Sequence, residues 1–397
     1  MKGLVLEGGG AKGSYHMGVV KALFENGYDF NAYVGTSIGA INAAVLAQGD
    51  FELAMELWEN ISMDQLFDEE EQYLLQLIKP DEVRINAGFP ANIKRALAKI
   101  ISGRGINTDK IRSYLEKYLD EDKIRSSGKD FGLVTVSLTE RKALELMLED
   151  IPRGQLVSYI MASASVPGLR PQKINEKIYL DGGLYNNVPV NLLYKKGYDD
   201  IIVIRTHAPG LVRNLDDYHN IKTISSTENL GSMFLFTKEN CQANVKLGYF
   251  DGLRFARKLP GKHYYIQPLD RDKLAMRLMA VDGKKIAEAA KLLGIAEYPP
   301  QRMLFEKVIP KLAPQLGLPE KYDYADFAIA LVEDMAIRNG IERFTLYDFK
   351  KLCSLAKKSK PIPKEESLAE KLSENHWVSK RKLAVELLAK AMLGICY

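Results

Sequence analysis

The sequence predicts an α/β fold with a mostly parallel central sheet, followed by a C-terminal helical extension. Residues 1–50 show the pattern strand, glycine turn, helix, strand, serine turn, helix. Two such units in succession imply parallel strands joined by crossover helices. Residues 200–204 (DIIVI) form the strongest buried-strand pattern of the chain. Residues 301–397 show helical patterns alone, interrupted by prolines at residues 361 and 363.

The elements between these landmarks follow from local periodicity. Residues 51–130 have a mostly helical pattern with polar and glycine breaks. Residues 131–138 (FGLVTVSL) predict a strand, and residues 144–148 are expected to pair beside it. A helix of small residues over 156–163 and a short strand over 177–180 complete this part of the chain.

The domain boundary is expected near residue 299. Residues 214–300 mix helical patterns with a short strand around 264–266, and Pro299 and Pro300 then interrupt the chain. We therefore expect a first domain over residues 1–298 and a helical region over residues 299–397.

Composition narrows the protein class. The chain has 397 residues, 46% hydrophobic and 27% charged, as is ordinary for a soluble globular protein. The three cysteines are widely spaced and form neither a metal-ligand pattern nor a disulfide framework, so we expect no metal and a reducing compartment. The first residues lack a signal-peptide pattern, and no run approaches the roughly 18 apolar residues of a membrane span. A cytoplasmic location is expected.

The net charge of the chain is too small to indicate a nucleic-acid partner, and we expect none. Residues 301–397 hold 17 Lys and Arg against 13 Asp and Glu, so the formal net charge of +4 lies in this region. A weak basic excess of this kind could favour an anionic surface, but a normally solvated helical surface explains it more simply.

The glycine cluster after the first strand offers backbone N–H groups. Gly8, Gly9 and Gly10 are followed by Ala11, Lys12 and Gly13, and then by a helical pattern. Unpaired N–H groups at a helix N-terminus favour a developing negative charge. Residues 8–13 also satisfy G-x-G-x-x-G, so a dinucleotide-binding oxidoreductase is the alternative.

That alternative needs an acidic residue at the end of the second strand to hold the ribose. Here the second strand runs directly into Gly35, Thr36 and Ser37, and Asp29 precedes it. The sequence therefore favours an oxyanion-binding role for the glycines over a cofactor, and we expect no cofactor.

The serine turn is a candidate nucleophile site. Gly35-Thr36-Ser37-Ile38-Gly39 has the form G-x-S-x-G and lies between a strand pattern and a helix of small residues. A strained strand-to-helix turn of this kind needs Gly35 and Gly39, because neighbouring backbone approaches closely there. The following helix directs its dipole at Ser37, which favours an alkoxide-like state.

Ser37 needs a base, and two residues compete for that role. Asp181 ends the strand over 177–180, and Gly182 and Gly183 follow, so the backbone can turn and leave the carboxylate facing a crevice. His207 follows the strand over 200–204, so a Ser37–Asp181–His207 triad esterase is a further alternative. In α/β-hydrolases several strands precede the nucleophile, whereas only one precedes Ser37, so we favour Asp181.

Together, GGGAKG (residues 8–13), GTSIG (35–39) and DGG (181–183) resemble, in order and spacing, the three signatures of patatin-like phospholipases. ASVPG (164–168) and NVPV (187–190) also resemble family segments. The likeness covers residues 1–210 well and 211–290 loosely. The family usually has Arg where this chain has Lys12, which keeps the charge but loses the planar fork.

The resemblance implies a three-layer α/β/α sandwich and a Ser–Asp dyad without histidine. Ser37 would be the nucleophile and Asp181 the base, within a catalytic domain over residues 1–298. Gly8, Gly9 and Gly10 would line the oxyanion hole. The substrate would be a lipid or lysolipid, and no metal or cofactor would be needed.

An enzyme of this kind also needs an acyl channel and access to aggregated lipid. Residues 51–130 are expected to supply helical cap material. Residues 233–236 (MFLF) could join the cap, although we expect them in the core. Basic and apolar residues over 380–390 leave open a peripheral membrane contact or a homo-oligomer through the C-terminal helices.

Overall fold

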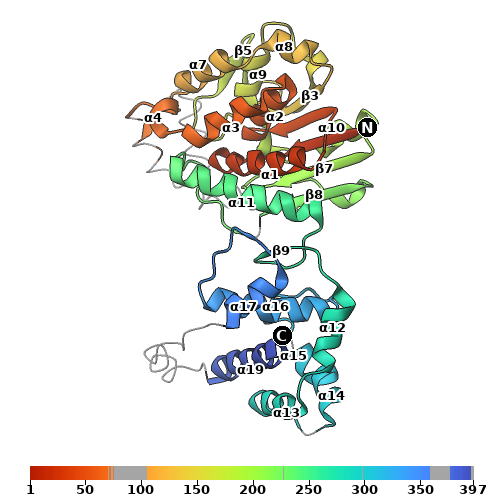
Figure 1. Ribbon diagram of the computed structural model, residues 1–397. Helices are drawn as coiled ribbons and strands as arrows, with labels where there is room; N and C mark the ends of the chain where they lie inside the picture. Colours follow the sequence, from red (N-terminus) through yellow and green to blue (C-terminus); the bar gives the residue numbers. More distant parts are fainter. Residues whose placement is uncertain are drawn as a thin grey trace. The chain divides into compact units, whose positions relative to one another are not determined.

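A computed structural model describes the backbone of residues 1–69, 71–72, 75, 105–226, 228–296, 298–357 and 376–394 (Figure 1). The chain forms two compact units, Met1–Ala256 and Arg257–Tyr397. The predicted boundary near residue 299 thus falls inside the second unit, and the extent of the catalytic domain stays a prediction. Part of the predicted cap over residues 51–130 lies outside the described residues.

The first unit is built on an eight-stranded, mostly parallel sheet. Five of its strands are mutually parallel and lie side by side in the order β3-β2-β1-β7-β8. They are β1 (Lys2–Leu6), β2 (Ala32–Thr36), β3 (Asp130–Ser137), β7 (Asp200–Arg205) and β8 (Ile221–Ser225). The chain reverses its direction of travel across the sheet between β1 and β7, and such switch points open a crevice at the carboxyl ends of the strands. The loop after β1 is the glycine cluster.

Three antiparallel strands extend the sheet at β3. They are β4 (Lys142–Met147), β5 (Gln172–Ile174) and β6 (Lys177–Asp181). The expected strands over 131–138, 144–148, 177–180 and 200–204 are confirmed within a residue or two.

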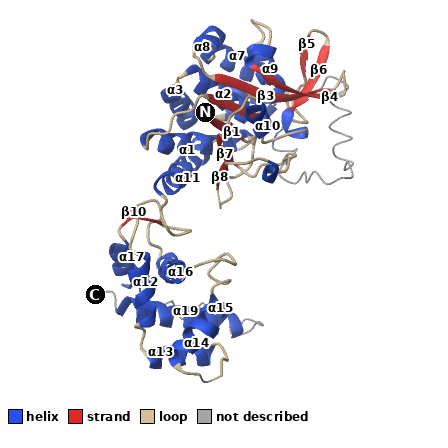
Figure 2. Ribbon diagram, turned by 90° about the vertical axis from the view of Figure 1, so that its right-hand side faces the viewer, coloured by secondary structure: helices blue, strands red, loops and turns tan. Residues whose placement is uncertain are grey.

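Helices cover both faces of the sheet, which gives the expected three layers (Figure 2). On one face Val5, Val34 and Val203 pack against α10 (Val190–Lys195) and the segment before it. The other face carries α1 (Ser14–Glu25), α2 (Ile38–Gln48) and α11 (Lys238–Arg257). Further helices of this unit are α3 (Phe51–Asn60), α4 (Met63–Leu66), α7 (Asp109–Tyr118), α8 (Glu121–Ser126) and α9 (Leu156–Ser163).

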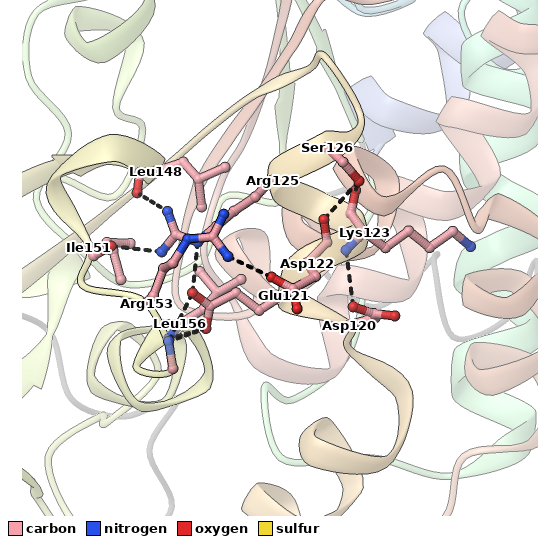
Figure 3. Close-up of polar contacts among 11 residues, drawn as sticks. Asp120, Glu121, Asp122, Lys123, Arg125, Ser126, Leu148, Ile151, Arg153 and Leu156 are labelled. Carbon is pink, nitrogen blue, oxygen red and sulfur yellow. Dashed lines mark hydrogen bonds and ion pairs between the residues drawn. The ribbon is translucent and has the colours of Figure 1, made fainter.

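A largely buried ion pair fixes where α9 begins (Figure 3). Arg125 Nε donates to Glu121 Oε1 at 2.7 Å, and its terminal nitrogens donate to the carbonyls of Leu148 and Ile151. Glu121 also accepts the N–H of Leu156, the first residue of α9. A carboxylate here satisfies an otherwise unpaired donor and complements the helix dipole. This matters because the other end of α9 reaches the candidate site.

In its described residues, the second unit is a helical body with a short parallel strand pair, β9 (Tyr265–Ile266) and β10 (Leu346–Tyr347). Its core joins residues from Tyr264 to Met392, including many before residue 299. This shared core explains why the unit begins earlier than the prolines suggested. The helices are α12 (Arg271–Met279), α13 (Gly283–Leu292), α14 (Pro300–Met303), a π-helical turn (Leu304–Val308), α15 (Ile309–Leu312), α16 (Tyr324–Arg338), α17 (Phe349–Lys357) and α19 (His376–Gly394).

Across the described ranges, every helix is too short or too polar to span a bilayer.

Candidate active site

The candidate site begins where two strands meet end to end beside β3. β4 occupies one edge of β3, so β2 and β6 must share the other edge. β2 runs parallel to β3 and ends with Thr36 opposite Val134. β6 runs the opposite way and ends with Asp181 opposite Thr135. The residue that follows β2 is Ser37, so the sheet brings Ser37 and Asp181 together from 144 positions apart.

Ser37 lies at a strained turn. Its backbone has φ 58° and ψ −127°, a conformation rare for a residue with a side chain. A Cβ on Gly39 would lie 2.1 Å from the Leu6 carbonyl oxygen, and one on Gly35 would lie 2.3 Å from the Gly39 backbone. Both glycines of the motif are therefore required by close backbone approach, as the sequence predicted. The Ser37 N–H donates to Ser163 Oγ at 2.9 Å.

Asp181 is held by two backbone contacts. Its N–H donates to the Ser165 carbonyl at 2.8 Å, and its Oδ1 accepts the Gly183 N–H at 2.7 Å. Both candidate residues are therefore held at this end of α9, through Ser163 in the helix and Ser165 just after it. A Cβ on Gly182 would lie 2.1 Å from the Val134 carbonyl oxygen, which explains the glycine after the aspartate.

Burial raises the pKa of Asp181 to about 7, against the opposing hydrogen bonds from Gly183 and Ser37. The side chain is only 4% exposed. Among the described residues, Asp181 Oδ2 has no partner that meets hydrogen-bond geometry. The Ser37 side chain lies close enough to oppose the rise of this pKa. A carboxylate with a pKa near 7 is a far better base than an ordinary aspartate.

The glycine loop offers two backbone donors. The N–H of Gly8 already faces the Asn187 carbonyl at 3.4 Å, and that of Ala11 donates to Met233 O at 2.8 Å. For Gly9 and Gly10, the described part of the chain contains no acceptor. Both have positive φ, and a Cβ on Gly10 would lie 2.1 Å from Met233 O. Gly9 and Gly10 are thus better placed as oxyanion donors than Gly8.

A buried carboxylate that the sequence analysis missed anchors this loop. Glu7 is fully buried, and its Oε2 accepts the N–H groups of Thr206 at 2.6 Å and His207 at 2.9 Å. Arg205 Nε lies 3.0 Å from the same oxygen. Thr206 Oγ1 in turn donates to the Gly8 carbonyl at 2.7 Å. Glu7 could have been found from the sequence, because it is a lone acidic residue at the end of an apolar strand, directly before three glycines.

The remaining predicted residues lie around this centre. Lys12 and Gly13 belong to a 3-10 turn (Gly10–Gly13) that leads into α1, and Lys12 is 9% exposed. His207 is exposed, and its hydrogen bond to Glu7 is made by its backbone. The interactions that shift the pKa of Asp181 come from burial, Gly183 and Ser37, without His207. The choice between the Ser37–Asp181 dyad and the triad with His207 stays a prediction.

An apolar pocket opens beside Ser37. It contains roughly 1070 Å³ of space free of protein atoms, including its mouth open to solvent. Its walls come from α2, α3, α7, the end of α9 and residues 233, 234 and 236. The expected core segment over 233–236 thus forms pocket wall instead, with Met233 and Phe236 buried and Leu235 exposed. Phe236 stacks on Trp58 across the pocket, with ring centroids 6.2 Å apart.

No described group of three or more His, Cys, Asp or Glu residues is arranged to hold a metal ion. Dinucleotide binding would need an acidic residue at the end of β2 to hold the ribose, but β2 ends at Thr36.

Comparison with known proteins finds similarity over the first half of the chain. Residues 4–194 match the family model described as patatin-like phospholipase. Patatin-like phospholipase domain-containing protein 7 of Rattus norvegicus is 26% identical over 204 residues, which is 51% of this chain and 13% of that protein. An uncharacterized NTE family protein of Mycobacterium bovis is 28% identical over 211 residues, 52% of this chain and 31% of that protein.

Lysophospholipase NTE1 of Kluyveromyces lactis is 28% identical over 200 residues, 49% of this chain and 12% of that protein. The match therefore spans a third or less of each of these relatives. Among solved structures, VipD of Legionella pneumophila aligns with a TM-score of 0.40 and 17% identity, covering 98% of this chain and 88% of that one. The type III effector ExoU aligns with a TM-score of 0.32 and 16% identity, covering 98% and 76%.

The matched segment contains Ser37, Asp181 and the glycine loop, and the similarity to lysophospholipases supports a lipid acyl hydrolase. Residues 4–194 therefore match the patatin-like phospholipase domain and contain the whole of the predicted dyad and oxyanion hole.

Proposed function

We propose that this protein hydrolyses fatty-acyl esters of phospholipids or lysophospholipids, with Ser37 as nucleophile and Asp181 as general base. The observation that supports the proposal is the end-to-end meeting of β2 and β6, which brings Ser37 close to Asp181, with Ser37 in the lining of an apolar pocket. Apolar walls suit an acyl chain, and the polar mouth suits the ester.

In the first step, Asp181 accepts the proton of the Ser37 hydroxyl as its oxygen attacks the ester carbonyl carbon. The carbonyl oxygen becomes an oxyanion, which the N–H groups of Gly9 and Gly10 and the N-terminus of α2 would stabilise. Each well-aimed donor of this kind is worth about 3 kcal/mol. The C–O bond to the alcohol then breaks, and Asp181 returns the proton to the leaving oxygen.

In the second step, the same groups act on water. Asp181 accepts a proton from a water molecule that attacks the acyl-Ser37 carbonyl. The second tetrahedral intermediate collapses, the proton returns to Ser37 Oγ, and the fatty acid leaves. A pKa near 7 suits both halves, because Asp181 must bind and release a proton at neutral pH.

Replacement of Ser37 by alanine tests the proposal. The full-length Ser37→Ala variant should release no fatty acid from lysophosphatidylcholine or phosphatidylcholine micelles, while its thermal unfolding stays close to that of the parent. Ser113→Ala is the matched control, because Ser113 is exposed on α7 and faces away from the pocket lining. Parent-level hydrolysis by a folded Ser37→Ala protein would refute the proposal.

The cytoplasmic location, a peripheral membrane contact and a homo-oligomer through the C-terminal helices stay predictions. Liposome flotation of the full chain, together with its mass in solution, would test them.

A further inference from the structure

Three helices contribute the same residue pattern to the pocket beside Ser37. Each supplies residues at positions i, i+3, i+4 and i+7, which form one face of a helix. The residues are Ile38, Ile41, Asn42 and Val45 of α2, Ala54, Leu57, Trp58 and Ile61 of α3 and its C-cap, and Ile111, Tyr114, Leu115 and Tyr118 of α7. The pocket is therefore lined along about two helical turns of each helix.

Hydrogen bonds fix how these helices run relative to Ser37. Gln48, at the end of α2, donates to the Tyr118 carbonyl at 3.1 Å and accepts the Asp120 N–H at 2.7 Å. The C-terminal ends of α2 and α7 therefore lie together, at the end of α2 away from Ser37. Trp58 Nε1 donates to Asn42 Oδ1 at 2.9 Å, which holds α3 against the middle of α2.

Asn42 is the polar residue among the four residues of α2 that line the pocket, and its side-chain amide is already hydrogen-bonded within the protein. Besides accepting from Trp58, its Nδ2 donates to the Gly13 carbonyl at 3.0 Å and lies 3.1 Å from His16 Nδ1. Burial lowers the pKa of His16 to about 3, so this histidine is neutral. The amide is thus not free to bind a head group, and the α2 wall suits an aliphatic chain.

The position of Val45 on α2 gives an estimate of how many carbons of an acyl chain fit between Ser37 and this residue. Val45 lies eight residues after Ser37, which is about 12 Å along a helix. An extended chain of single bonds advances about 1.2 Å per bond, the spacing of an extended polypeptide backbone. An acyl chain whose carbonyl carbon lies at Ser37 would therefore reach Val45 at about its tenth carbon.

We propose that this pocket binds the fatty-acyl chain of the substrate along α2, and that Val45 and Tyr118 determine selectivity for chain length at about carbon ten. This inference rests on the proposed function, since it takes Ser37 as the point of acyl attachment. It goes further by assigning specificity to two residues that lie far from the ester.

The test compares kcat/KM of the full-length protein for p-nitrophenyl hexanoate, dodecanoate and hexadecanoate. In Val45→Phe, the ratio of dodecanoate to hexanoate should fall at least about tenfold. The larger side chain displaces the last two or more carbons, and each buried methylene is worth about fourfold in affinity. In Tyr118→Ala, the ratio of hexadecanoate to dodecanoate should rise about fourfold or more, because loss of the tyrosine ring lengthens the pocket at its end away from Ser37. Tyr194→Ala, which removes an exposed tyrosine of α10, should change neither ratio.

Thermal unfolding establishes that each variant is folded. If Val45→Phe does not fold, Tyr118→Ala decides alone, because truncation of a partly exposed side chain leaves the Gln48 hydrogen bond to its carbonyl intact. Ratios within twofold of the parent in the folded variants would overturn the chain-length role. That result is distinct from failure of the proposed function, in which Ser37→Ala would still hydrolyse all three esters.

Discussion

The polar crevice and the apolar pocket of the first unit are built in different ways. The crevice is set by the backbone: strand pairing aligns Ser37 with Asp181, and glycines admit close approach of neighbouring main chain. The pocket is set by side chains that three helices present at helical spacing. This difference predicts that reactivity and chain-length preference depend on separate residues, so mutations should affect one without the other.

The largest effect in the crevice, apart from loss of the reacting groups, is expected from Gly10→Ala. The new methyl group would lie 2.1 Å from Met233 O at φ 57°, so the loop must move and misdirect its free N–H groups. Loss of an oxyanion donor costs about 10²- to 10³-fold in kcat. Steady-state kinetics on a soluble ester should show this loss, with the chain-length ratios preserved.

Gly49→Ala provides the matched control. Gly49 also has positive φ, at 86°, but a Cβ there meets no atom within 4 Å. This variant carries the same kind of backbone strain away from the crevice and should keep its activity. Equal losses in both variants would mean that general strain, and not the donors of the loop, explains the Gly10 effect.

The next largest effect is expected from pH, which should change reactivity in the crevice without changing the chain-length preference of the pocket. Because burial raises the pKa of Asp181 to about 7, the base is protonated and inactive at lower pH. We expect kcat/KM to fall about tenfold per pH unit below that value, for short and long esters alike. An acid limb near pH 4 would indicate an ordinary, solvated carboxylate.

The same pKa predicts a stability effect with a definite sign. A carboxyl whose folded pKa is raised from 3.8 to about 7 stabilises the fold at low pH, and this contribution is lost as the pH rises through about 7. Asp181→Asn cannot ionise, so it should unfold at higher temperature than the parent above pH 7. The difference is at most about 4 kcal/mol, at 1.36 kcal/mol per pKa unit. A variant less stable than the parent at pH 8 would contradict the burial of a charged Asp181.

A smaller effect is expected from Ser163→Ala. The change removes the acceptor of the Ser37 N–H in a fully buried position, and an unsatisfied buried donor costs about 1–3 kcal/mol. We expect kcat to fall about tenfold with little change in KM, because the turn that aims Ser37 loosens while the pocket stays intact. Ser127→Ala, which removes a similar helix-end hydroxyl from α8, is the control. Equal kinetics in both variants would remove Ser163 from the positioning of Ser37.

The turns of the crevice could be predicted from the sequence, because glycines and short polar residues at strand ends have few structural alternatives. Ser37, Asp181 and the loop glycines occupy turns whose backbone requirements are visible in the local sequence. The supporting residues were harder to find. Ser163 acts from the end of a helix 126 positions away from Ser37, and Glu7 acts through a neighbouring strand.

An acyl channel was expected, but the residues that line the pocket could not be predicted, because each of its three helices also has the pattern of an ordinary core-facing helix. Only tertiary contacts such as Gln48 with Tyr118, or Trp58 with Asn42, show which faces surround a space. The start of the second compact unit, at Arg257, could not be predicted for the same reason. Pro299 and Pro300 interrupt the local pattern, but the core of the second unit continues across them.

The most direct test of the account is the rate and site of labelling by an alkyl fluorophosphonate, followed by mass spectrometry of the intact protein and its peptides. We expect one label per chain, on the peptide that contains Ser37, with labelling at least about 10³-fold slower in Asp181→Asn because the base is lost. A label on another residue, or labelling of Ser37 at the parent rate in Asp181→Asn, would contradict it.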